Sequence, residues 1–430
     1  MTALRTLVLA ALAAVAPAEA GAADEFASAL RGLEPELRGK QLEQRAAELA
    51  LLPGSIEGWL EIQAAEGLPP SGDGAPEPLS AAQHDLLARV APRLAREEVL
   101  LYVADQLKSA PKPAWRGAAL DLLHWHASSA DLSLLVDLVK EPDGKLPSEG
   151  PLFRGFQDTL VEIVRRDQRI YGRIPWLSEN APTLYPCAVR ALGLAGEVEA
   201  LPYLAGMLED RAISRVALQE ISRLAPRAPK ASRAGLADRV RPYLEASDKA
   251  TRGHAIRALV ALRDDKAVPD LIAVVEGEDR GGRDAVFAGL RELTGRSLPD
   301  QAARWRSWYD EELRWFEKDA TVALDSLGSG EEAQVVAAIR AISGHGLERD
   351  RLAEGIVRVL REHPSAAVRA QACLGLERLR SRAGLEGLAL ALSDPDATVG
   401  SHALQALRSI TGLNLPWDPN AWREALRKVE

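Results

Sequence analysis

Residues 364–412 read PSAAVRAQACLGLERLRSRAGLEGLALALSDPDATVGSHALQALRSITG, and this stretch decides the fold. Its residues Leu385, Leu388 and Leu392 are spaced by three and four positions, which places them on one stripe of a helix. The segment Asp394-Pro395-Asp396 follows, and an aspartate there can cap a next helix by accepting from its free N–H groups. A second apolar helical run comes directly afterwards. The stretch therefore predicts two consecutive helices that share a core.

The same pair of patterns recurs along the chain. The stripe of the first helix is repeated at Leu132/Leu135/Val139, Leu201/Leu204/Leu208 and Val268/Leu271/Val275. The second helix has anchor positions at 192, 221, 259, 290, 342, 376 and 407. Most of these intervals fit one helix pair per repeat of a stacked solenoid, and the longer interval between 290 and 342 predicts an insertion.

Composition supports an all-α fold and argues against nucleic acid as the main partner. Hydrophobic residues make up 47% of the 430 residues and aromatic residues only 5%, with Ala and Leu dominant, as suits tightly packed helices. The 62 acidic and 53 basic residues give a formal net charge of −9. Phosphate binding needs a basic excess on one face, which this balance does not predict.

A family resemblance follows from the repeat text. Pro364 to Leu376, followed by Leu385 to Asp394, resembles the bacterial HEAT-like repeat, a family named partly from phycobilisome lyases. The Val-Arg pair of the second helix is matched at Val368-Arg369 and Val189-Arg190, while Val399-Gly400 departs from it and suggests a degenerate repeat. The resemblance runs from about Leu132 to the C-terminus. It implies an α-α superhelix, a HEAT/armadillo-like solenoid of stacked antiparallel helix pairs, and it implies little about activity.

One longer block is duplicated at an offset of 117 positions. The pattern Leu-Arg-x-x-Thr-Gly-x-x-Leu-Pro begins at Leu290 and again at Leu407, and the two copies end in Trp305-Arg306 and Trp422-Arg423. The block resembles an element of exported HEAT-repeat proteins of high-GC bacteria. Each glycine is placed to end a helix in a left-handed cap. Two interpretations of Trp305 and Trp422 stay open, namely packing of the loop onto the stack and contact with a partner.

The N-terminus predicts export. Arg5, an apolar stretch from Leu7 to Val15 and the small-x-small pattern Ala18-Glu19-Ala20 indicate a signal peptide over 1–20 with cleavage near Ala20, and hence a periplasmic or secreted protein. We expect no later membrane span.

The mature chain is expected in three parts. An N-terminal helical segment covers 21–66, a Pro/Gly-rich linker covers 67–78, and the HEAT-like solenoid covers 79–430. Within the solenoid, the Pro-punctuated and aromatic stretch 170–186 predicts a projecting loop.

No constellation of residues predicts catalysis, a cofactor or a metal. His124 and His126 lie two apart and point to different sides of a helix, so they are poorly placed to share an ion. Prolines interrupt the only Ser-x-x-Lys match, at Ser109. Cys187 and Cys373 lie in distant repeats, so we expect two buried thiols and no disulfide.

These observations favour a non-catalytic protein-interaction scaffold with a protein partner. The second helix of each pair should line the binding wall, and we select Trp305, Trp422, Arg190 and Arg257 as candidate partner contacts. Two alternatives stay open. One is an enzyme or ligand carrier of the bilin-lyase-like HEAT class, which rests on the family name alone. The other is a structural component of an envelope assembly.

Overall fold

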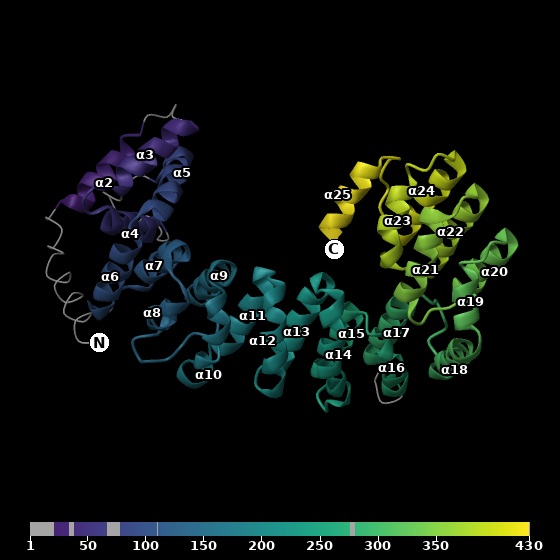
Figure 1. Cartoon of the computed structure of the whole chain (residues 1–430). Coiled ribbons are helices and arrows are strands. Elements are labelled where there is room, and N and C mark those ends of the chain that lie inside the picture. The colour runs from purple at the N-terminus through teal and green to yellow at the C-terminus, as the bar shows by residue number, and fades with distance from the viewer. Residues whose placement is uncertain (1–20, 34–37, 67–77, 110, 276–279, 430) are drawn as a thin grey trace, which may run out of the picture. The chain divides into compact units, whose positions relative to one another are not determined.

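The computed structural model of the chain describes residues 21–33, 38–66, 78–109, 111–275 and 280–429. The predicted signal peptide and residues 67–77 of the predicted linker lie outside these ranges. The chain divides into two compact units, unit 1 from Met1 to Ala200 and unit 2 from Leu201 to Glu430, and each consists of helices stacked on one another (Figure 1). The predicted all-α solenoid is confirmed, since the described residues contain helices, turns and loops but no strand.

Unit 1 is built from ten α-helices and short 3-10 turns in its described residues. The α-helices are α2 (Ala22–Arg31), α3 (Lys40–Ala50), α4 (Ser55–Glu66), α5 (Ala81–Val90), α6 (Arg96–Gln106), α7 (Pro113–His126), α8 (Leu132–Val139), α9 (Pro151–Arg166), α10 (Trp176–Asn180) and α11 (Tyr185–Ala195). The segment predicted as a separate N-terminal part packs into this same unit, because α3 packs on α5 and α4 packs on α7.

Unit 2 is built from fourteen α-helices in its described residues. Its α-helices are α12 (Leu201–Gly206), α13 (Ser214–Leu224), α14 (Lys230–Val240), α15 (Lys249–Leu262), α16 (Val268–Val274), α17 (Arg280–Thr294), α18 (Ala302–Lys318), α19 (Ala320–Ser326), α20 (Glu332–Ile342), α21 (Arg349–Glu362), α22 (Ala366–Leu379), α23 (Leu385–Ala391), α24 (Ala397–Thr411) and α25 (Pro419–Val429). The insertion predicted between positions 290 and 342 contains α18 and α19.

The predicted helix pair at α23 and α24 shows why these residues fold in this way. Leu385, Leu388 and Leu392 are buried and belong to one core cluster with residues of α22 and α24. The Asp396 side chain accepts from the Thr398 N–H at 2.8 Å and caps α24, as the sequence predicts. Helix α24 ends at Gly412, whose φ of 72° is the left-handed conformation that favours glycine.

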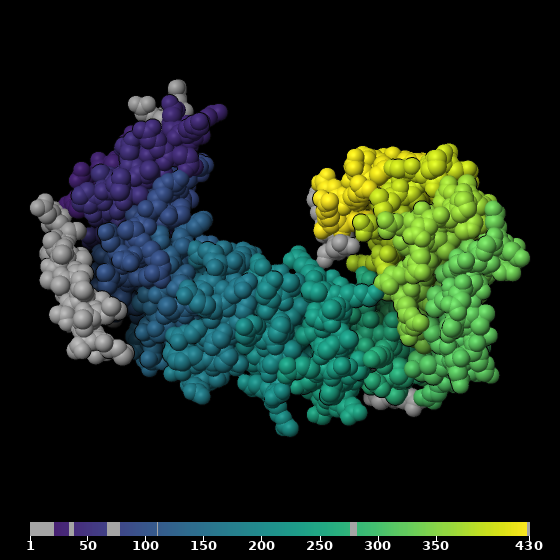
Figure 2. Space-filling model, in the orientation of Figure 1, coloured from purple at the N-terminus to yellow at the C-terminus, as the bar shows by residue number. Residues whose placement is uncertain are grey.

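Helices that pack successively on one another form what we call ladder helices. In unit 1 these are α2, α4, α7, α9 and α11, each packed on the next. In unit 2 they form two runs, α13–α15–α17 and α20–α22–α24. Side chains fill the space between successive ribbons (Figure 2). The side chains of the ladder helices that point away from the core form successive rows, one row on each helix.

A tandem duplication in unit 2 is longer than the block recognised in the sequence. Helices α15, α16 and α17 begin and end 117 positions before α22, α23 and α24, and α18 begins 117 positions before α25. We call α15–α18 copy A and α22–α25 copy B. Arg252 in copy A donates to the carbonyls of residues 246 and 247, and Arg369 in copy B donates to those of residues 363 and 364. The equivalent arginines of the two copies therefore bond equivalent backbone carbonyls in the turns before α15 and α22.

The prediction of a projecting loop over 170–186 was wrong. The stretch forms a 3-10 turn and helix α10, and its apolar side chains Ile170, Ile174 and Leu177 are fully buried. The prolines of the sequence favour a loop, but the apolar side chains between them are buried in the core of unit 1.

Candidate partner-binding surfaces

The two tryptophans selected from the sequence lie inside the stack. Trp305 and Trp422 are both 0% exposed. The Trp422 Nε1–H donates to the Pro416 carbonyl at 3.0 Å and so fastens the loop that precedes α25. The Trp305 Nε1–H is buried and has no hydrogen-bond partner among the described residues. This burial favours the packing interpretation, because neither ring offers surface to a partner.

A different tryptophan of the duplicated block is exposed. Trp417 is 46% exposed, its Nε1–H donates to the Leu392 carbonyl at 2.8 Å, and its ring lies directly over Gly400. Any side chain at position 400 would overlap this ring. The departure from the Val-Arg pattern at Val399-Gly400 therefore has a physical reason, which is the room that the ring needs.

The ladder helices of unit 1 present a row of carboxylates that we call the acidic wall. Its members are Asp24 on α2, Glu57 and Glu61 on α4, Asp121 on α7 and Asp158 on α9. Partial burial and the charges of Glu57 and Asp24 raise the pKa of Glu61. Partial burial raises the pKa of Asp121 as well, against a hydrogen bond from Gln63, and the charge of Asp158 adds to the rise. None of the five forms an ion pair with a described basic residue.

Arg190 lies at the end of the acidic wall. It is half-buried on α11, one turn after the buried Cys187. The charges of Arg190 and Asp158 both act on the pKa of Cys187. The Cys187 thiol also contacts Gln157 Oε1 at 3.6 Å. Arg190 and Asp158 therefore both lie close enough to Cys187 to act on its pKa, which places Arg190 beside the last carboxylate of the wall.

Arg257 lies on a ladder helix of unit 2 in a different setting. It is exposed on α15, and its Nη2 lies 2.9 Å from His254 Nδ1, one turn earlier on the same helix. Arg215 on α13 is close enough for its charge to act on His254 too. Partial burial, Arg257 and Arg215 together hold the pKa of His254 below its ordinary value. Sequence analysis selected Arg257 and missed Arg215, which only the packing of α13 on α15 brings beside it.

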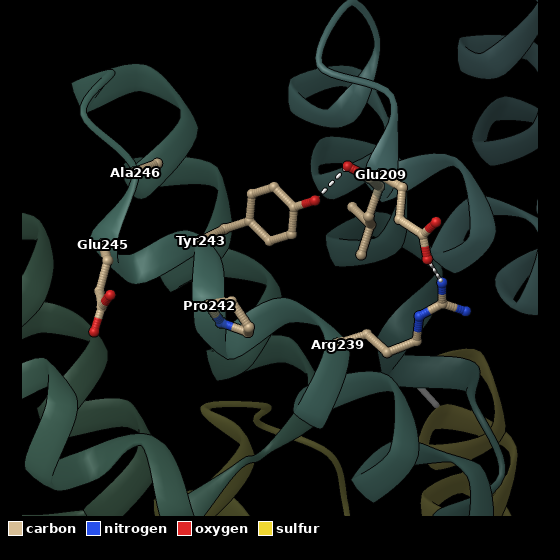
Figure 3. Close-up of a pocket in the computed structure, with 7 residues that line it drawn as sticks. Glu209, Arg239, Pro242, Tyr243, Glu245 and Ala246 are labelled. Carbon is tan, nitrogen blue, oxygen red and sulfur yellow. Dashed lines mark hydrogen bonds and ion pairs between the residues drawn. The ribbon is translucent and has the colours of Figure 1, made fainter.

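A pocket in unit 2 lacks the groups that chemistry needs. It has a volume of about 420 Å³, and its lining comes from the turn after α12, from Arg239 on α14 and from the turn after α14 (Figure 3). Arg239 and Glu209 at its rim form an ion pair at 3.1 Å, and the Tyr243 hydroxyl donates to the Leu208 carbonyl. Pro242, Glu245 and Ala246 complete its lining. Arg239 is thus already paired with Glu209, and Glu245 is the remaining charged residue of the lining.

The buried carboxylate Glu312 has a structural explanation. It is 3% exposed and accepts from the N–H groups of Gly346 at 2.9 Å and Leu347 at 3.1 Å. His345 approaches the same carboxylate at 3.2 Å and stacks on Trp315 with ring centroids 3.6 Å apart. Glu312 thereby ties the loop before α21 to α18. No group of three or more His, Cys, Asp or Glu residues in the described ranges is placed to hold a metal ion.

The other side chains considered from the sequence lie apart from any shared site. His126 is buried with Nε2 2.7 Å from the Ala91 carbonyl, while His124 is half-buried and packs edge-on against the exposed Trp125. Cys187 and Cys373 are both buried free thiols, and burial raises the pKa of each to about 12. No helix of the described residues combines the length and the apolar character that crossing a membrane requires.

Comparison with known proteins agrees with this architecture. A family model of HEAT repeats matches residues 353–421. The match covers most of α21, all of α22, α23 and α24, and the first residues of α25. No curated protein matches the sequence significantly.

Solved structures show only a distant likeness. Importin beta is 13% identical, with 94% of this chain and 57% of that chain covered and a TM-score of 0.38. Kap121p, solved bound to Nup53p, is 14% identical, with 94% and 51% covered and a TM-score of 0.34. An engineered protein is 16% identical, with 90% and 98% covered and a TM-score of 0.30. The chain spans little more than half the length of importin beta and of Kap121p, and the likeness concerns the fold alone.

Proposed function

We propose that this chain is a non-catalytic scaffold of the exported or periplasmic space, and that it binds a protein partner through the outward side of its ladder helices. The observation that carries the proposal is the acidic wall of unit 1. None of its carboxylates forms an ion pair with a described basic residue, and two of them have raised pKa values. The repulsion between these neighbouring negative charges is reduced when a cationic segment binds.

The repeat architecture supports this proposal. Stacked helix pairs expose long surfaces on which neighbouring repeats each contribute one row of side chains, and such surfaces suit extended partners. Rows on α2, α4, α7 and α9 would contact successive residues of one basic polypeptide segment. The assignment to an exported space rests on the signal peptide expected over 1–20.

The test is capture of a partner followed by reconstitution with purified proteins. The chain from Gly21 onward is used as bait in an exported-fraction extract of its own host, and a captured protein is then produced separately. Its affinity is measured for wild type and for the triple variant Glu61→Gln, Asp121→Asn, Asp158→Asn. We expect the triple variant to bind about tenfold more weakly, since each exposed charge pair contributes about 0.2–1 kcal/mol.

A matched control separates the wall from net charge. The triple variant Glu97→Gln, Glu98→Gln, Glu149→Gln removes the same charge from exposed carboxylates of unit 1 that lie off the ladder helices. We expect it to bind the partner like wild type. Equal weakening by both triple variants would refute a role for the wall. Purification with a bound small molecule and no protein partner would replace the scaffold by a ligand carrier or an enzyme.

A further inference from the structure

Two ladder helices of unit 2 bring three basic side chains together. Arg215 lies on α13, and His254 and Arg257 lie one turn apart on the neighbouring α15. Arg215 and Arg257 are exposed, and neither forms an ion pair within the described residues. In a chain with a net charge of −9, two adjacent unpaired guanidinium groups are an unusual local excess of positive charge.

The Asp248 carboxylate, which interacts electrostatically with Arg215, is already engaged by hydrogen bonds from α15. Asp248 accepts from the Thr251 N–H at 2.9 Å and the Thr251 hydroxyl at 2.7 Å, which caps α15. The charge of Arg215 contributes to its lowered pKa only after these hydrogen bonds. The two guanidinium groups therefore keep most of their hydrogen-bond donors available for an external acceptor.

The second copy of the duplication has other side chains at the positions of His254 and Arg257. Copy B has Gln371 where copy A has His254, and Leu374 where copy A has Arg257. The two helices nevertheless have equivalent bounds, and the framework arginines 252 and 369 make the same contacts in both. The helix therefore keeps the same bounds in the two copies although the side chains at these two positions differ.

His254 holds Arg257 in place. The lone pair of a neutral imidazole at Nδ1 can accept from Arg257 Nη2, and the 2.9 Å separation is that of a hydrogen bond. The long arginine side chain is fixed by this contact, which lowers the entropy that it loses when a ligand binds. Guanidinium groups present parallel N–H donors that match the two oxygens of a carboxylate.

We propose that Arg215 and Arg257 form a binding site for a carboxylate-rich segment of a partner protein, with His254 as the residue that positions Arg257. The site rests on the proposed scaffold function, but it lies in the other unit and selects the opposite charge from the acidic wall. Arg215 on α13 and Arg257 on the neighbouring α15 would each pair with one carboxylate of the segment.

The test uses fluorescein-labelled decaglutamate and the full mature chain, with binding followed by fluorescence anisotropy at low salt. The double variant Arg215→Gln, Arg257→Leu takes its second change from copy B. We expect it to bind at least about tenfold more weakly, as each charge-assisted hydrogen bond is worth about that factor or more. The control is Arg358→Gln, Arg361→Gln, which removes two exposed arginines from α21 and should leave the affinity unchanged.

Two further variants test the positioning role. His254→Gln keeps a side-chain acceptor and should retain binding, whereas His254→Leu should weaken it. Equal weakening by the two double variants, or no binding of decaglutamate by wild type, would overturn the site. Inorganic phosphate that binds more tightly than decaglutamate would overturn the assignment to a carboxylate partner. The triple variant of the acidic wall should bind decaglutamate at least as well as wild type, so failure of this site and failure of the proposed function are distinguishable.

Discussion

Trp305 and Trp422 allow the cost of one hydrogen bond to be measured inside a single chain. Both rings are fully buried at equivalent positions, but only the Trp422 Nε1–H has a partner, the Pro416 carbonyl. Replacing either tryptophan by phenylalanine removes similar volume and the indole N–H. The cavity contribution, of the order of 1–3 kcal/mol, is then similar at the two sites.

The hydrogen-bond contribution has opposite sign at the two sites. Trp422→Phe loses a net stabilisation of about 1 kcal/mol and leaves the Pro416 carbonyl without its donor. Trp305→Phe removes a buried donor without a partner, a group whose desolvation costs about 1–3 kcal/mol. We therefore expect Trp422→Phe to lower the free energy of unfolding by about 2 kcal/mol more than Trp305→Phe.

Urea unfolding followed by far-UV circular dichroism measures this difference. Repeat proteins can open in parts, so hydrogen exchange of the amides in α18 and α25 is measured alongside. Equal losses for the two variants, or a larger loss for Trp305→Phe, would refute the reasoning.

Three further outcomes follow from the structure. Asp121→Asn should raise the free energy of unfolding in urea at neutral pH by a few tenths of a kcal/mol, because the raised pKa of Asp121 means that ionisation in the folded state is unfavourable. This gain should vanish below about pH 3.8, the ordinary value, where the carboxyl is protonated in both states. Gly117→Ala in α7, where an added Cβ meets open space, should stabilise unit 1 by about 0.5–1 kcal/mol in thermal unfolding. Gly375→Ala in α22 should instead cost about 1–3 kcal/mol in the same measurement, because its Cβ would lie 2.6 Å from Ile339 Cγ2, and a gain there would contradict the packing described.

The architecture was predictable because it depends on local spacing. Apolar residues three and four positions apart place α8, α12, α16 and α23 within the predicted segments, and the glycines at 295 and 412 end helices in the predicted left-handed conformation. The repeated pattern also predicts the order in which the helices follow one another along the chain. It contains no information on how far two ladder helices turn relative to each other, and this rotation decides which side chains meet.

The candidate surfaces were predictable only in part for that reason. Arg190 and Arg257 were selected because they follow the repeat motif, but Arg215 joins Arg257 only through the packing of α13 on α15. Tryptophan chemistry was overestimated at positions 305 and 422, since the same amphipathic ring that suits an interface also fills a core. The exposed Trp417 has no counterpart in the first copy, where Asp300 stands, so a search for shared residues passes over it.

The two buried thiols give the chain a natural pair of kinetic reporters. Cys187 lies in unit 1 and Cys373 in unit 2, and each is inaccessible to an alkylating reagent while its helices stay packed. Labelling therefore requires local opening, and its rate depends on the opening free energy of the unit concerned. Mass spectrometry of the labelled peptides would then measure the rate at which each unit opens in the unaltered protein. A partner that binds and stabilises only one unit would slow the alkylation of that unit's cysteine and not of the other.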